Sequence, residues 1–106
     1  MKKKTRYENK EHLLFVSTFP CMVCGAYPVQ VHHLLKPRDG KRGWGLKAGD
    51  NNVVPLCQKH HAELHTKIGN EFKFFKMHCD KEEAGMEYAE ELYERFQNNS
   101  DSDLPF

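Results

Sequence analysis

The chain has 106 residues, enough for one small domain, and its 39% hydrophobic and 29% charged residues are ordinary for a globular protein in water. No apolar run approaches the roughly 20 residues of a membrane span, so we expect no membrane segment. Charged residues follow the basic start MKKKTR where a secretion signal would be apolar. We therefore expect a reducing cytoplasmic location, in which cysteines more often act as metal ligands than form disulfides.

The net charge of +1 conceals two parts of opposite sign. Residues 1–76 hold 14 Lys/Arg and six Asp/Glu, a net of +8, whereas residues 77–106 hold two and nine, a net of −7. A positive field over the first part would attract a polyanion such as DNA. A merely solvated charged surface is the alternative explanation.

The predicted elements alternate between helix and strand. A short helix is expected over residues 8–17, and residues 29–33 (VQVHH) are β-branched and alternate as a strand does. Four glycines and a proline mark residues 36–50 as a loop. Residues 52–56 (NVVPL) predict a second strand, whose proline confines it to a sheet edge or a strand end. Residues 58–68 then have no helix breaker before Gly69.

Two amphipathic helices are expected after this point, over residues 70–78 and 82–96, followed by a polar tail. Phe72 and Phe75 share one side of the first of these helices, with Phe74 left open as a third member, and such aromatic residues indicate core packing rather than base stacking. The expected organisation is a basic segment and helix at 1–18, a core with the zinc site at 19–68, packing helices at 69–97 and a tail at 98–106.

Cysteine and histidine pairs from two separate segments have the spacing of a tetrahedral structural zinc site, C-x2-C and C-x2-H. The predicted ligands are Cys21, Cys24, Cys57 and His60. Gly25 would relieve the backbone where the first pair forms a tight knuckle. Cys79 is the rival to His60, but it lies beyond two predicted helical segments, so we expect a free core thiol there.

A second set of histidines is interleaved with the first. Successive residues of a helix differ by about 100° in direction, so His60 and His61 cannot face the same ion. His61 and His65, four residues apart, share a face. The full order is His32-His33, then Asn52, then His61-x3-His65. This order is typical of a metal-dependent nuclease centre.

Basic residues surround a tryptophan among the glycines of the 36–50 loop. Cations neutralise phosphates and glycines allow close approach of the backbone, so the loop is a candidate contact for nucleic acid. The candidate residues are Lys36, Arg38, Lys41, Arg42, Trp44 and Lys47. A flexible loop with solvated charges is the alternative.

In these blocks the chain resembles the HNH endonucleases of the ββα-metal (His-Me finger) superfamily. VHHLL, NNVVPLC and CQKHHAELH occur in the order and spacing of that superfamily, and the His-x3-His ending is similar to that of colicin DNases. Over about residues 19–95 the chain more closely resembles a phage and prophage family of recombination-enhancement nucleases. The segments that carry this resemblance are PCMVCGAYPVQVHHL, GWGLKAGDNNVVPLCQKHHAELH and GNEFKFF. The resemblance implies an α+β fold, a small ββα-metal domain with a zinc knuckle and flanking helices.

The resemblance also implies a role for each residue. His32 would bind the catalytic metal together with His61 and His65, and His33 would be the general base. Asn52 would fix the loop that bears the base through its side-chain amide, with Asn51 as the competing choice. Because a strand points neighbouring side chains in opposite directions, both histidines could serve only if the strand bends or ends there, and we expect such a bend.

The expected activity is hydrolysis of DNA phosphodiester bonds, one strand at a time, leaving 5′-phosphate and 3′-hydroxyl ends. The expected cofactors are a structural zinc and a catalytic divalent metal, whose identity the imidazole set leaves open among zinc, nickel, cobalt, manganese and magnesium. The chain would act as a monomer or weak dimer, with a recombination protein as a possible partner. The alternatives are a non-catalytic zinc-stabilised nucleic-acid-binding module and a protein whose metals only hold its fold.

Overall fold

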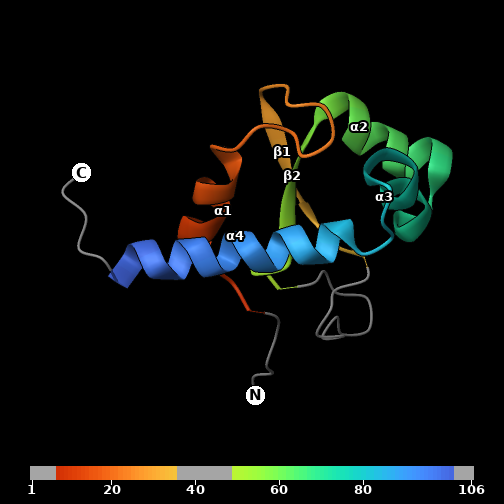
Figure 1. The fold of residues 1–106 in the computed structure, drawn as a ribbon. Coiled ribbons are helices and arrows are strands. Elements are labelled where there is room, and N and C mark those ends of the chain that lie inside the picture. The colour runs from red at the N-terminus through yellow and green to blue at the C-terminus, as the bar shows by residue number, and fades with distance from the viewer. Residues whose placement is uncertain (1–6, 36–48, 102–106) are drawn as a thin grey trace, which may run out of the picture.

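The computed structural model describes residues 7–35 and 49–101 of the chain. Within them, a two-stranded sheet stands between α1 on one side and α2 and α3 on the other, and α4 runs below the sheet from α1 to α3 (Figure 1). This is the α+β class expected from the sequence. None of the described helices is long and apolar enough to cross a membrane.

The sheet pairs β1 (Val29–His33) with β2 (Val53–Cys57) in antiparallel register, His32 opposite Val54 and His33 opposite Val53. The bounds of β1 are those predicted, and β2 is displaced by one residue. Pro55, which donates no ladder hydrogen bond, is tolerated because each strand of a two-stranded sheet is an edge strand.

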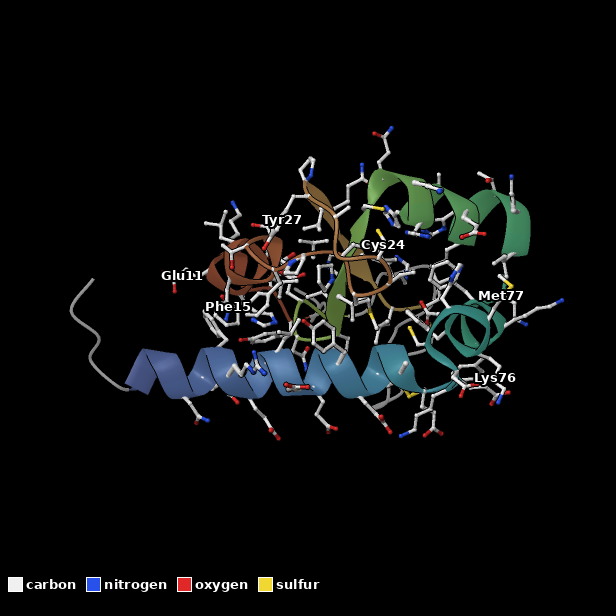
Figure 2. All side chains as sticks on the ribbon, turned by 45° about the horizontal axis from the view of Figure 1, so that its top comes forward. Glu11, Phe15, Cys24, Tyr27, Lys76 and Met77 are labelled. Carbon is white, nitrogen blue, oxygen red and sulfur yellow. The ribbon has the colours of Figure 1, made fainter. Side chains whose placement is uncertain are left out.

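Every residue of β2 is buried, because both faces of this strand are covered. On one face Val54 and Leu56 pack with Leu64, Phe74 and Phe75. On the other face, Val53 packs with Val16 of α1 (Lys10–Ser17) and Leu92 of α4 (Ala84–Asp101). Figure 2 shows Phe15 between α1 and α4, whereas Glu11 points away from the core. The hairpin is thus the centre of the core.

The ligand-bearing helix begins directly at the end of β2. α2 (Gln58–Glu63) continues into a π-helical segment, η1 (Leu64–Ile68), and ends at Gly69 with φ +65°. Only glycine adopts this left-handed conformation without strain, which explains the predicted stop. Leu64 packs inward and is fully buried.

Two further helices follow, α3 (Glu71–Cys79) and α4. α3 buries Phe74 and Phe75, so Phe74, which the sequence left open, belongs to the core side, whereas Phe72 is only partly buried. The reason is that Glu71 takes the buried position at the start of the helix. α4 reaches Asp101, beyond the expected helix end at residue 96.

Candidate metal centres

Four potential ligands gather where the knuckle meets the start of α2. The ligand atoms of Cys21, Cys24, Cys57 and His60 all lie within 4.8 Å of one another. The sulfurs of Cys24 and Cys57 are 3.8 Å apart, and Nδ1 of His60 lies 3.3 Å from Cys57 Sγ and 3.9 Å from Cys21 Sγ. Tetrahedral zinc bonds would separate two sulfurs by about 3.8 Å and a sulfur from a nitrogen by about 3.6 Å. The donor set and its spacing therefore fit a structural zinc ion.

The backbone prepares the knuckle for thiolates. Gly25 has φ +78°, and its amide donates to the Cys21 carbonyl at 2.8 Å, closing the turn. Burial disfavours the Cys21 thiolate, but hydrogen bonds from the backbone at Cys57, Cys24 and Val23 outweigh it and lower the pKa of that thiol. Cys57 begins α2 without a side-chain capping bond, so its sulfur is available to a metal.

A second cluster consists of His32, His61 and His65, and His61 directly follows the zinc-site residue His60 on α2. Nδ1 of His32 and Nε2 of His65 each lie 3.2 Å from Nε2 of His61. Tetrahedral ligation by imidazoles separates neighbouring nitrogens by about 3.3 Å. β1 supplies the first ligand, α2 the second and η1 the third, as the helical spacing predicted. Their arrangement suits one divalent ion.

The protons on these rings also favour an ion. Nε2 of His32 donates to Glu71 Oε2 at 2.8 Å, and Nδ1 of His61 is 2.6 Å from Gln30 Oε1. A neutral imidazole that donates through one nitrogen has a lone pair on the other. With these tautomers the lone pairs of His32 and His61 both point into the cluster, an arrangement that a cation between them would stabilise.

The cluster contains one histidine that is held neutral, and it is open on one side. Burial and the neighbouring His32 and His65 lower the pKa of His61 to about 4, which keeps its imidazole in the metal-binding form at neutral pH. His32 is buried, whereas His61 is half-buried and His65 is exposed. A ligand from solution could therefore reach an ion held here.

Carboxylates and an amide around the histidines were absent from the sequence prediction. Glu71 accepts from His32 and also from the Leu35 amide at 2.9 Å, and it is 3% exposed. Gln30 lies two residues before His32, so strand alternation could have indicated it. Only the tertiary fold brings Glu71 to the cluster, because α3 lies beyond η1 in the chain.

His33 points away from this cluster, as alternation along β1 requires. Its Nε2 lies 2.7 Å from Asp50 Oδ1, and among the described residues its side chain has no hydrogen bond or ring contact with His32, His61 or His65. β1 remains regular and ends at His33, so the expected bend is replaced by the end of the strand. Asp50 is a second carboxylate that the sequence did not indicate.

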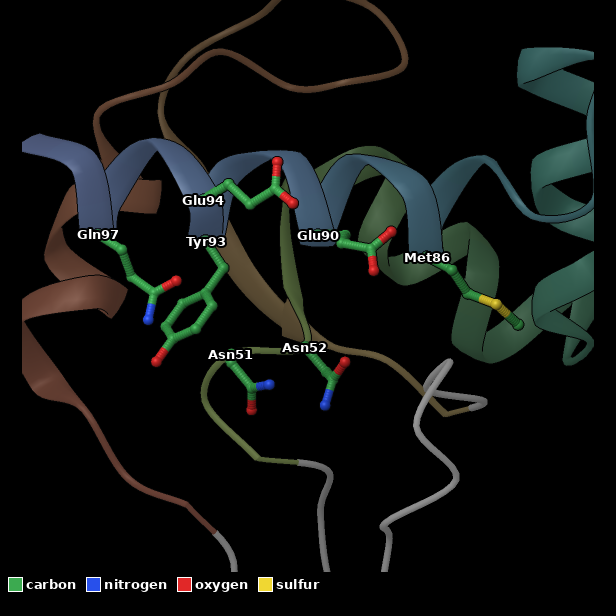
Figure 3. A pocket seen from close by; sticks show the side chains of 7 residues that line it. All are labelled: Asn51, Asn52, Met86, Glu90, Tyr93, Glu94 and Gln97. Carbon is green, nitrogen blue, oxygen red and sulfur yellow. The ribbon is translucent and has the colours of Figure 1, made fainter.

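Asn52 fixes the turn after His33 through its backbone. The Leu34 amide donates to the Asn52 carbonyl at 2.9 Å. The Asn52 and Asn51 side chains line a cavity of about 430 Å³ beneath α4 (Figure 3). Its other lining residues are Met86, Glu90, Tyr93, Glu94 and Gln97. This cavity contains none of the proposed metal ligands, and its carboxylates disfavour a phosphate.

Neither the group of His60, Glu63 and His78 nor the thiol of Cys79 forms a separate metal site among the described residues. His60, Glu63 and His78 also group closely, but His60 already belongs to the cysteine set, and Glu63 pairs with His78 at 2.9 Å. Cys79 is a free, half-buried thiol packed against the core and belongs to no ligand group found in the described residues. Burial raises the pKa of Cys79, which makes it a poor ligand.

The predicted DNA-contact residues of the loop lie outside the described residues. These are Lys36, Arg38, Lys41, Arg42, Trp44 and Lys47. Their role stays a prediction from composition.

The molecule is thus a small α+β protein with a Cys3His cluster and a three-histidine cluster. Residues 1–88 match the family described as "Protein of unknown function (DUF968)", and the chain belongs to that family. Over 64 residues, 60% of this chain, it is 44% identical to "Uncharacterized protein YdfU" of Escherichia coli (strain K12). The match spans only 18% of that relative's length. No solved structure matches the chain significantly.

Proposed function

We propose that this chain is a metal-dependent HNH-type endonuclease that hydrolyses phosphodiester bonds in DNA. The observation that carries the proposal is a difference between the two clusters: in the described residues, one has four protein ligands and the other has three. Structural zinc sites are closed by four ligands, whereas catalytic sites keep a position open. The open position of the three-histidine cluster could take a phosphate oxygen or water.

The order of elements supports the same proposal. An antiparallel hairpin, β1 and β2, leads directly into α2, and this brings His32 against His61 and His65. A hairpin followed by a metal-bearing helix is the ββα-metal arrangement that the sequence resemblance implies. The zinc knuckle would hold the start of that helix in place.

In the proposed reaction a water oxygen attacks phosphorus and the bond to the 3′ oxygen breaks. His33 accepts the proton of the attacking water, and the 3′ oxygen gains a proton from solvent. A divalent ion in the three-histidine cluster would supply positive charge to the phosphate and the leaving oxygen. Imidazole ligands favour zinc, nickel, cobalt or manganese, and magnesium is the weakest fit because it prefers oxygen.

DNA is the proposed substrate because residues 1–76, which contain every proposed ligand, have a net charge of +8. One active site per chain cuts one strand at a time, so a double-strand break would require two nicks or a dimer. A recombination protein as partner is a further expectation from the sequence resemblance alone.

The test is incubation of supercoiled plasmid with purified protein, with added divalent metal and after chelation. We expect metal-dependent conversion to the nicked circle, and DNA ligase should reseal the nicks because the ends carry 5′-phosphate and 3′-hydroxyl. Metal-independent DNA binding without any nicking would instead favour the non-catalytic zinc-stabilised binding module.

A further inference from the structure

We infer that Asp50 is a positioning residue that fixes the tautomer of His33 and so prepares it as a base. This inference rests on the proposed nuclease function. Asp50 Oδ1 lies 2.7 Å from Nε2 of His33, and the Asp50 side chain is only 4% exposed. A bond this short between a buried carboxylate and an imidazole is a strong, oriented interaction.

The N-terminal segment holds the carboxylate in place. Asp50 Oδ2 accepts the Asn9 backbone amide at 2.8 Å, at the N-cap of α1. The Asp50 amide in turn donates to the Tyr7 carbonyl at 2.9 Å. Each oxygen of Asp50 therefore has a different partner, and the carboxylate cannot rotate without breaking a hydrogen bond. Residues outside the hairpin and its helix thus complete the surroundings of the candidate base.

The hydrogen bond decides which nitrogen of His33 can accept a proton. When the Asp50 carboxylate accepts this hydrogen bond, Nε2 carries the hydrogen, and in the neutral ring the lone pair is then on Nδ1. Among the described residues no hydrogen bond reaches Nδ1 of His33. The His33 side chain keeps 16% of its surface exposed, so water can approach the ring. The Asp50 carboxylate would also stabilise the imidazolium that forms during the reaction.

The substitution Asp50→Asn distinguishes a positioning role of Asp50 from a merely structural one. Asparagine keeps the size of the side chain, and its oxygen must turn to the Asn9 amide, because that amide is a fixed donor. Its NH2 group then faces Nε2 of His33, which must become the acceptor, and the proton moves to Nδ1. Both hydrogen bonds survive, but the base is in the wrong tautomer.

The experiment combines two readouts on the zinc-loaded full chain. Long-range proton–nitrogen correlation spectra should show the hydrogen of His33 on Nε2 in wild type and on Nδ1 in Asp50→Asn. Plasmid nicking by Asp50→Asn should fall about 10²- to 10⁴-fold, the range for loss of a general base. His33→Ala should fall similarly, and the double variant should lose no more, because Asp50 acts through His33. Asp80→Asn removes an equivalent charge at an exposed helix end and should match wild type.

An unchanged tautomer in Asp50→Asn would overturn the inference. So would wild-type nicking by Asp50→Asn while His33→Ala is inactive. A wild-type protein that never nicks DNA would overturn the proposed function, and the spectra would then decide separately whether Asp50 sets the tautomer.

Discussion

Nε2 of His32 lies 2.8 Å from a carboxylate oxygen of Glu71, and both side chains are only 2% exposed. Glu71 begins α3, so this contact ties a helix outside the hairpin to the three-histidine cluster. The next residue, His33, is held through the same ring atom by Asp50. Adjacent histidines are thus fixed by two carboxylates on opposite sides of β1. Nδ1 of His32 faces His61, and Nδ1 of His33 has no hydrogen bond among the described residues.

Glu71→Gln should weaken metal binding at the three-histidine cluster by about tenfold, the lower end of the range for residues that hydrogen-bond to a metal ligand. The amide can still accept a hydrogen bond, but it lacks the charge that makes His32 a more basic ligand. Competition with a chelator measures this affinity. Glu63→Gln removes another carboxylate paired with a histidine and is the matched control. Equal affinities in both variants would refute the role of Glu71.

Cys24→Ser should release the structural zinc and unfold the domain. Cys24 is exposed, so the substitution removes almost no packing and its effect reports on the metal. Structural zinc contributes about 10–16 kcal/mol, as much as the entire stability of an ordinary domain. Zinc content and thermal melting are the measurements, with Cys79→Ser as control. Retention of zinc at an unchanged melting temperature would show that Cys24 is not a ligand.

Replacing Lys41 and Arg42 together by alanine should lower the slope of log affinity for duplex DNA against log salt by up to about 1.8, for two lost phosphate contacts. Cleavage should be poor at low DNA concentration and recover when DNA is saturating, because the metal ligands lie elsewhere in the chain. DNA binding titrations at several salt concentrations provide the slope. A slope identical to that of wild type would place the DNA track outside this loop.

His12 should make the fold sensitive to acid. It is fully buried against Tyr93 and Phe96, and neither ring nitrogen has a hydrogen-bond partner among the described residues. Burial lowers the pKa of His12 from 6.5 to about 4, although Asp50 opposes this shift. Between pH 6.5 and about pH 4, His12 is therefore protonated in the unfolded chain but neutral in the folded protein. Stability contributed above pH 6.5 is lost as pH falls towards 4.

The measurement is chemical denaturation of wild type and His12→Leu at pH 7 and pH 5. Between these conditions, wild type should lose about 2 kcal/mol more of its unfolding free energy than the leucine variant does. Acid also weakens both metal sites, but that loss is common to the two proteins and cancels in the comparison. Parallel pH dependences would show that His12 does not carry the effect.

Much of the secondary structure could be predicted from local sequence patterns. The strand over residues 29–33 has its predicted bounds because alternation and β-branching act along the chain itself. The two ligand sets separate on one helix because His60 and His61 must differ in direction. For α4, by contrast, the helix extends past residue 96 without further apolar residues to mark it.

The partners of the histidines could not be found in this way. Glu71 reaches His32 across 39 residues and Asp50 reaches His33 across 17, and neither has a spacing that follows from helix or strand geometry. A buried carboxylate at the first position of α3 contradicts the usual preference of that residue for solvent. Only the three-dimensional packing of α3 and α1 around the hairpin explains both carboxylates.

We propose one structural zinc and one separate catalytic metal in each chain. The most direct test is a titration of plasmid nicking with divalent metal. The starting protein should retain its structural zinc and lack metal in the three-histidine cluster. We predict that nicking rises with added manganese or nickel and reaches a plateau near one equivalent per chain, with His61→Ala folded, zinc-loaded and inactive. Absence of nicking at every metal concentration, or equal nicking by His61→Ala, would contradict the account.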